Sequence, residues 1–299
     1  MKPAWKGVFP AATTQFDANL ALDLRATQRG VARMIDDGVH GIIALGTVGE
    51  NASLTADEKR RALSAVVEAA EGRVPVIAGV TEFTTEAGCA YARDAGRLGV
   101  SGLMVLPAMV YVPKPDELLA HFRALARATS LPVMIYNNPP AYRVNVTLET
   151  LEALGAEENV VAIKESAEDT RRFSDIVNAF GDRFLLFAGL DDVAFEGLSL
   201  GAVGWVSGLS GAFPKENVRF FELMQEGRWA EARAIYRWMM PLLHLDSRPD
   251  LVQCIKLVED VLGHGSERVR PPRYVLTGAE RDAVIALVEI AKRTRPKLD

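Results

Sequence analysis

The chain has 299 residues, of which 49% are hydrophobic and 24% are charged, with 24 glycines and 15 prolines. This composition is ordinary for a folded globular enzyme and excludes the collagen, coiled-coil and disordered classes. With 34 Lys and Arg against 39 Asp and Glu, the formal net charge is −5. The chain therefore lacks the basic excess that holds nucleic acid by counterion release, and we expect no nucleic-acid partner.

The chain has two cysteines, Cys89 and Cys254, which lie far apart and in no C-x-x-C pair. This count excludes a disulfide framework and a cysteine-rich zinc site, and it fits a reducing cytoplasm. The N-terminus lacks the apolar run of a signal peptide, and no segment approaches the ~18 apolar residues of a membrane span. We expect a cytoplasmic protein without a membrane partner.

Short apolar runs alternate with segments of helical periodicity, and this alternation predicts parallel βα units. Helical patterns lie between the runs at, for example, 55–71, 84–98, 115–128 and 147–154, and several open with a Thr or Asp cap. Eight such units indicate an α/β protein, a (β/α)8 TIM barrel. The expected strands are 8–12, 41–45, 74–78, 102–106, 133–136, 160–164, 184–188 and 202–206.

Beyond Gly211 the pattern contains only helices, at 214–224, 230–240, 249–262 and 278–293. The first closes the barrel, so we expect a catalytic barrel over 1–225 and a C-terminal helical region over 226–299. The alternative fold is an open doubly wound sheet, which carries a Gly-rich phosphate turn after its first strand. The sequence Thr13-Thr14-Gln15-Phe16 at that point provides no such turn, and the barrel is favoured.

The sixth strand ends in Ile163-Lys164-Glu165, which brings a lysine to the carboxyl end of a barrel strand, where catalytic groups are found. Desolvation favours the neutral amine, which can attack a ketone and form a Schiff base. Alternatively, Lys164 reaches water or pairs with Glu165. Its position alone does not decide between the two.

The neighbouring fifth strand ends in Tyr136-Asn137, so a phenol lies at the same rim. Carbinolamine formation and dehydration each require a proton transfer, which this phenol could perform. A tyrosine that only packs, with its hydroxyl in water, is the commoner case for an isolated residue. The proximity of Lys164 favours the catalytic interpretation.

The turn Gly46-Thr47-Val48-Gly49-Glu50-Asn51 follows the second strand. Its successive backbone N–H groups could form an anion nest for a small carboxylate, with the Thr47 hydroxyl as a further donor. A plain glycine-rich connection is the alternative.

In order and spacing, these three motifs resemble the dihydrodipicolinate synthase / N-acetylneuraminate lyase family. The resemblance covers essentially the whole chain, including the 189–192 turn, the 201–207 stretch and the helical C-terminal region. It implies a class I, metal-free enzyme without a cofactor, commonly a homotetramer, that binds a small 2-oxo acid as a Schiff base. It also implies that Lys164 is the Schiff-base lysine, Tyr136 the proton shuttle, Thr47 and Val48 the carboxylate-binding turn, and Gly189 and Val206 the sources of backbone groups near the lysine.

The chain departs from the synthase pattern at three places. The second of two adjacent hydroxyl residues in the turn is replaced by Val48. Met109 falls where a tyrosine is expected, with Tyr111 two residues on, and Ala141 falls where an arginine would bind the aldehyde substrate's carboxylate, with Arg143 two residues displaced. These departures disfavour dihydrodipicolinate synthesis itself.

The stretches 7–16, 46–51, 136–139, 243–246 and 251–256 resemble a hydroxyproline-catabolic subgroup that deaminates 1-pyrroline-4-hydroxy-2-carboxylate to 2,5-dioxopentanoate and ammonia. An aldolase or dehydratase of 4-hydroxy-2-oxo acids would use the same iminium, so this intermediate alone does not distinguish the three activities. A catalytically silent, ligand-sensing barrel is an alternative of another class, which Lys164 and Tyr136 together disfavour.

Other polar residues receive structural interpretations. The four histidines show no metal-binding spacing, and we expect no metal site. Asp191 and Asp192 precede a helix and are interpreted as caps. The stripe from Trp229 to Met240 is interpreted as bundle core or a subunit contact.

Overall fold

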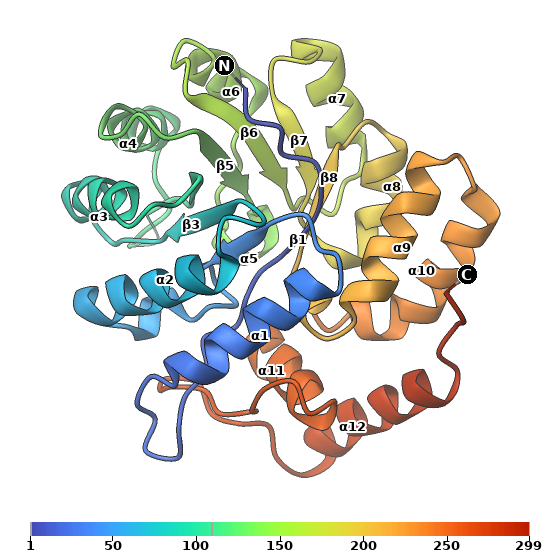
Figure 1. Ribbon diagram of the computed structural model, residues 1–299. Helices are drawn as coiled ribbons and strands as arrows, with labels where there is room; N and C mark the ends of the chain where they lie inside the picture. The colour runs from blue at the N-terminus through green and yellow to red at the C-terminus, as the bar shows by residue number, and fades with distance from the viewer. Residues whose placement is uncertain (1, 109, 299) are drawn as a thin grey trace.

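The computed structural model describes residues 2–108 and 110–298. Eight parallel strands form one sheet in the order β1-β8-β7-β6-β5-β4-β3-β2. Ala11, directly after β1, forms a parallel bridge with Ile43 in β2. This bridge joins the two edges of the sheet and closes it into a barrel. Figure 1 shows the strands at the centre and the helices outside them. The predicted (β/α)8 barrel is confirmed.

Each strand overlaps a predicted apolar run, and both faces of the strands are buried, as expected for parallel strands covered by helices. Two starts differ from the prediction by two residues, and the others by at most one. β3 begins two residues later, after Pro75, which has no N–H to donate to a neighbouring strand. β8 also begins two residues later, because Ala202 N–H bonds back to Gly197 O and completes the preceding turn. The strands are β1 (Gly7–Pro10), β2 (Ile42–Ala44), β3 (Val76–Val80), β4 (Gly102–Val105), β5 (Val133–Asn137), β6 (Val160–Glu165), β7 (Leu185–Ala188) and β8 (Gly204–Ser207).

The helices between the strands begin at capping residues. Thr55 forms a capping box with Glu58, and the side chains of Thr84 and Thr147 accept hydrogen bonds from first-turn N–H groups. The barrel helices are α1 (Leu24–Asp36), α2 (Ala56–Ala70), α3 (Thr85–Arg97), α4 (Pro115–Arg127), α5 (Pro139–Tyr142), α6 (Leu148–Leu154), α7 (Arg171–Phe180) and α8 (Ala194–Ser199), with 3-10 turns η1 (Asn51–Ser53), η2 (Asp191–Val193) and η3 (Leu209–Gly211).

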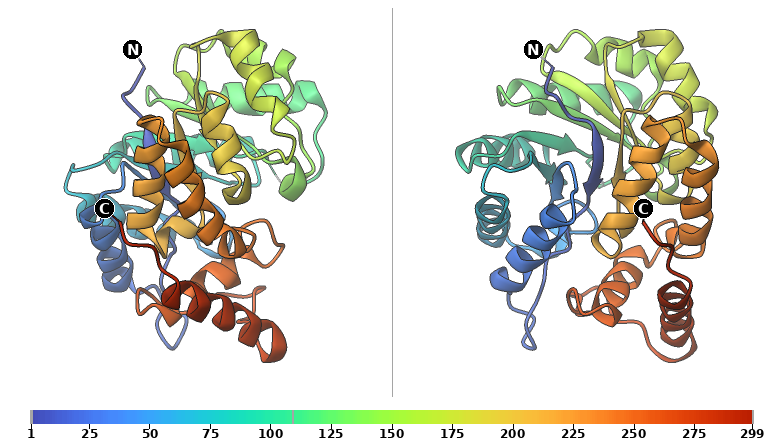
Figure 2. Two further views of the ribbon diagram at one scale, coloured as in Figure 1. Left: turned by 90° about the vertical axis from the view of Figure 1, so that its right-hand side faces the viewer. Right: turned by 45° about the vertical axis from the view of Figure 1, so that its right-hand side comes forward.

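The C-terminal segment consists of α9 (Pro214–Gln225), α10 (Trp229–Leu243), α11 (Leu251–Val261) and α12 (Gly278–Arg293). α9 and α10 pack on each other, with the rings of Phe220 and Tyr236 stacked 5.1 Å apart. Tyr236 and Met239 are buried, as a bundle core requires. Figures 1 and 2 show α11 and α12 together at the end of the molecule opposite the N-terminus. No described helix is both long enough and apolar enough to cross a bilayer.

Candidate active site

A cavity lies at the carboxyl ends of the strands, where barrel enzymes bind their substrates. Its volume is about 490 Å³, counting the space at its mouth that is open to solvent. Strands β4, β5 and β6, helix α5, loops that follow other strands, the segment after α10 and the start of α11 all contribute to it. It is lined by Ala11, Gly46, Thr47, Val48, Met104, Tyr136, Asn138, Ala141, Tyr142, Lys164, Leu190, Gly208, Asp246 and Leu251.

Lys164 and Tyr136 meet in this cavity. They are register partners on β6 and β5, and Lys164 Nζ lies 4.0 Å from the centroid of the Tyr136 ring. The lysine is only 6% exposed. Burial lowers its pKa, whereas the electrostatic influence of Asp246, followed by that of Tyr142 and Asp191, raises it. Desolvation therefore increases the fraction of neutral, nucleophilic amine.

Gly189 leaves the space that the lysine side chain occupies. A Cβ at this position would lie 2.9 Å from Lys164 Cε and 2.0 Å from Ser166 Oγ. The structure thus places Gly189 beside the lysine. Val206, the other residue expected there, is fully buried in β8 opposite Phe9 and is absent from the described cavity lining.

A second tyrosine, Tyr142 at the end of α5, contacts both the ring of Tyr136 and the Gly46–Glu50 turn. Its hydroxyl lies 2.5 Å from Thr47 Oγ1, and its ring packs edge-on against that of Tyr136. Tyr136 Oη accepts a hydrogen bond from Asn138 Nδ2 at 2.9 Å. Burial raises the pKa of Tyr136 to about 12 and that of Tyr142 well above its usual value, so both phenols stay protonated at neutral pH. The sequence prediction missed Tyr142, whose one signal was its place six residues after Tyr136.

The turn after β2 presents backbone donors to the cavity. Gly46, Thr47 and Val48 line it, and the N–H groups of Thr47 and Val48 bond to no other described residue. These N–H groups and the Thr47 hydroxyl are available to a carboxylate. Val48 contributes an apolar wall in place of a second hydroxyl.

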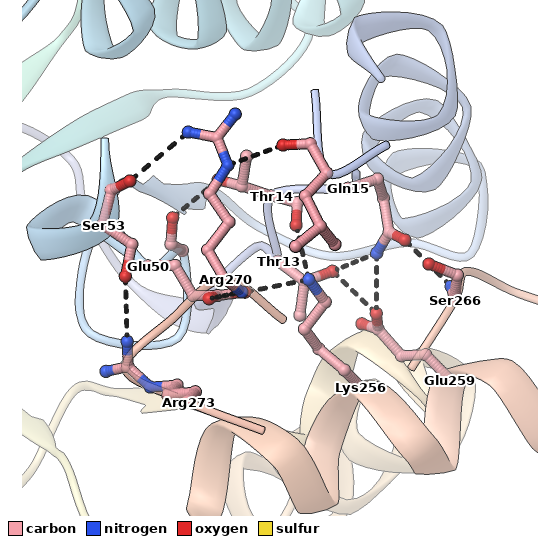
Figure 3. Close-up of polar contacts among 12 residues, drawn as sticks. Thr13, Thr14, Gln15, Glu50, Ser53, Lys256, Glu259, Ser266, Arg270 and Arg273 are labelled. Carbon is pink, nitrogen blue, oxygen red and sulfur yellow. Dashed lines mark hydrogen bonds and ion pairs between the residues drawn. The ribbon is translucent and has the colours of Figure 1, made fainter. Parts of the chain in front are cut away.

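A buried polar cluster, shown in Figure 3, supports this turn on the side away from the cavity. Glu50 accepts hydrogen bonds from Lys256 Nζ at 2.9 Å and from the Arg270 backbone N–H at 3.0 Å, and both the Glu50 and Lys256 side chains are 0% exposed. Lys256 also donates to Thr14 O at 2.8 Å, and Thr14 Oγ1 donates to Gly49 O at 2.6 Å. The cluster therefore fixes α11, which bears Lys256, against the Gly46–Glu50 turn. The sequence prediction also missed this pair.

Asp246, in the segment after α10, brings a carboxyl group to the cavity. It packs against Gly208, where a Cβ would lie 2.1 Å from Asp246 Oδ1. Burial raises the pKa of Asp246 to about 6, and the positive charge of Lys164 opposes this shift. This acid can therefore gain or lose a proton near neutral pH.

The interpretation of Asp191 as a helix cap was wrong. Its carboxylate is fully buried and accepts hydrogen bonds from Trp205 Nε1 at 2.9 Å and from Leu209 N–H at 2.8 Å. It forms no side-chain cap on η2 and instead fixes the loop after β8. Its neighbour Asp192 pairs with His244 Nδ1 at 3.0 Å. A carboxylate surrounded by loop N–H groups from elsewhere in the chain cannot be recognised from local sequence.

The positions that depart from the synthase pattern are placed as follows. Ala141 lines the cavity, and Arg143 is exposed at the end of α5 and outside the described lining. Tyr111 is 61% exposed, and Met109 lies outside the described residues. Among the lining residues that the structure describes, Lys164 is the one basic side chain and Asp246 the one carboxylate. No group of three or more His, Cys, Asp or Glu residues within 2–108 and 110–298 is arranged to hold a metal ion.

Comparison with known proteins gives a consistent result. Residues 4–291 match the model of the dihydrodipicolinate synthetase family. The chain is 33% identical to 4-hydroxy-tetrahydrodipicolinate synthase of Acidobacterium capsulatum, over 92% of each chain, and 32% identical to 4-hydroxy-tetrahydrodipicolinate synthase 1 of Halalkalibacterium halodurans, over 92% of this chain and 93% of that one. It superposes on a dihydrodipicolinate synthase of Bacillus anthracis with a TM-score of 0.92 at 28% identity, covering 99% of this chain and all of the other.

Proposed function

Because the chain belongs to the dihydrodipicolinate synthetase family, whose members are class I lyases, we propose that it forms a Schiff base through Lys164 with a small 2-oxo acid or cyclic imine. One observation carries this proposal: a desolvated amine lies over the Tyr136 ring and opens to the cavity. Tyr136 is proposed as the proton shuttle at the lysine. Thr47 and Val48 are proposed to bind the substrate carboxylate, and Gly189 to make room for the lysine.

The charges of the cavity favour a substrate with a single carboxylate. One carboxylate can be bound at the Thr47–Val48 turn, but a second would find no arginine among the described lining residues and would face Asp246. A like charge at short range disfavours such a ligand. This pattern supports 1-pyrroline-4-hydroxy-2-carboxylate over the aldehyde substrate of a synthase, which carries its own carboxylate.

We therefore propose 1-pyrroline-4-hydroxy-2-carboxylate deaminase as the specific activity. Lys164 adds to C2 of the cyclic imine, the ring nitrogen leaves C2 as an amine, and a protonated Schiff base remains. Loss of a C3 proton gives an enamine, which expels the C4 hydroxyl as water. Rearrangement and hydrolysis then release ammonia and 2,5-dioxopentanoate, with a net consumption of one water. The proposed working form is a homotetramer without a cofactor.

The test is to incubate the purified protein separately with the cyclic imine and with 4-hydroxy-2-oxoglutarate, and to assay ammonia and pyruvate. Ammonia from the imine without pyruvate from either compound is the expected result. Pyruvate release with no ammonia would contradict the deaminase assignment and identify an aldolase, while leaving the Lys164 chemistry in place. No turnover and no lysine adduct with either compound would favour a ligand-sensing barrel.

A further inference from the structure

We propose that Asp246 is the catalytic carboxylate that removes the C3 proton of the Lys164 Schiff base and returns it to the departing C4 hydroxyl. This inference rests on the proposed Schiff base and extends it to the next bond. The sequence motif that contains Asp246, residues 243–246, does not by itself assign this residue a role.

The position of Asp246 is the first support. It lines the same cavity as Lys164, and each is the strongest electrostatic neighbour of the other. Its carboxylate lies against the backbone of Gly208, and any side chain at that position would displace it, since a Cβ there would lie 2.1 Å from Oδ1. A glycine at this close contact allows a carboxylate to reach the wall of the substrate cavity.

The groups around Asp246 are the second support. Lys164 faces it from β6, Tyr136 from β5, and Asp191 and Asp192 from η2. The Asp191 carboxylate already accepts hydrogen bonds from Trp205 Nε1 and from the N–H groups of Gly208 and Leu209, so it is not available to the substrate. Burial raises the pKa values of the two phenols, so they stay protonated at neutral pH and cannot accept the C3 proton in that state. Asp246 is the group in the described lining that is ionised above about pH 6 and able to accept a proton.

The proton and electron balance needs no further reagent. The carboxylate of Asp246 takes the C3 proton, and the C3–H electron pair becomes the C2=C3 bond of the enamine. That pair then shifts to form C3=C4 as the C4–O bond breaks. The proton on Asp246 passes to the leaving oxygen, which departs as water, and the carboxylate is regenerated. One group thus serves as base and then as acid.

Exchange of the pyruvate methyl protons in D2O tests this step directly, because it needs the enamine but no particular natural substrate. Exchange is followed by NMR, and Schiff-base formation is followed separately by borohydride reduction and mass analysis of the Lys164 peptide. For Asp246→Asn, we expect the adduct to persist and exchange to fall about 100-fold or more, the usual range for loss of a general base. Asp246→Glu restores a carboxyl group and should recover part of the rate.

A pH profile separates proton transfer from a structural role. The wild-type exchange rate should rise as pH increases through about 6, because Asp246 becomes ionised, and Asp246→Asn should lack this limb. Exchange by Asp246→Asn at the wild-type rate would overturn the proposal, and so would loss of adduct and exchange together in both variants. Absence of an adduct in the wild-type protein would instead contradict the proposed function.

Discussion

Lys164 and Tyr136 are paired in register on adjacent strands, and the amine of one lies 4.0 Å from the ring centroid of the other. Side chains at paired positions of parallel strands point to the same face of the sheet. The nucleophile and the phenol are therefore fixed to each other by the backbone of the barrel rather than by a flexible loop. Such an arrangement limits the side-chain motion that would separate them.

Gly189→Ala tests whether the space around the lysine is required. The added methyl group would lie 2.9 Å from Lys164 Cε and 2.0 Å from Ser166 Oγ, so the lysine side chain must shift. A displacement of about 1 Å can cost ~100-fold in rate, and we expect kcat to fall by that order. Gly30→Ala is the matched control, because a Cβ there meets nothing within 4 Å. Equal kcat for Gly189→Ala and the control would contradict the prediction.

Tyr142→Phe tests the contact between the Tyr142 and Thr47 hydroxyls. The variant keeps the ring against Tyr136 and removes the hydroxyl that lies 2.5 Å from Thr47 Oγ1. We expect kcat to fall roughly tenfold, corresponding to about 1.4 kcal/mol. Thr47→Val should lower kcat to a similar extent and should also raise KM, because Thr47 is proposed to bind the substrate carboxylate. The double variant should lose little more in kcat, since both changes break the Thr47–Tyr142 contact. Strict additivity in steady-state kinetics would show that the two hydroxyls act separately; Tyr111→Phe, on an exposed side chain, is the control.

Ala141→Arg tests the charge argument for substrate choice. The new cation enters the cavity lining where the described residues provide none besides Lys164. A charge-assisted hydrogen bond contributes about 1.5–3 kcal/mol, so 2-oxoglutarate should inhibit tenfold or more tightly, with pyruvate little affected. Ala141→Met controls for side-chain size. If the inhibition constant for 2-oxoglutarate is the same in both variants, the second carboxylate does not bind near this position.

Lys256→Met tests the Lys256–Glu50 pair that holds the Gly46–Glu50 turn. Glu50 would lose its buried partner, and breaking such a pair costs about 3–5 kcal/mol. Urea unfolding should therefore show a large loss of stability, and the Lys256→Met/Glu50→Gln variant should recover part of it, because no unpaired charge remains. A single variant more stable than the double variant would contradict this explanation. Activity at saturating substrate should change less than KM, since the pair supports the turn and not the lysine.

The sequence predicted the barrel because parallel strands covered on both faces appear as apolar runs, and because Thr and Asp caps mark helix starts. Lys164 and Tyr136 were found because they end such runs. The strand ends were less accurate, as at β3 and β8, where a proline and a turn hydrogen bond decide the start. The predicted division at residue 225 stays a prediction.

Asp246, Tyr142 and Lys256 could not be assigned roles from the sequence. Each acts through a partner far away along the chain: Asp246 faces Lys164, Tyr142 bonds Thr47, and Lys256 pairs with Glu50. The roles of these residues depend on how the C-terminal helices and α5 pack on the barrel. The local periodicity of the sequence carries no information about this packing. The same reason explains the wrong assignment of Asp191 as a cap.

Covalent trapping at Lys164 is the most direct measurement of the proposed chemistry. Wild-type protein is incubated with pyruvate, reduced with borohydride, digested and mapped by mass spectrometry, with the Lys256 peptide as an internal control for a second buried lysine. We predict the reduced adduct on the Lys164 peptide alone, and none in Lys164→Arg. An unmodified Lys164 peptide, or an adduct of equal yield in Lys164→Arg, would contradict the assignment of Lys164 as the nucleophile.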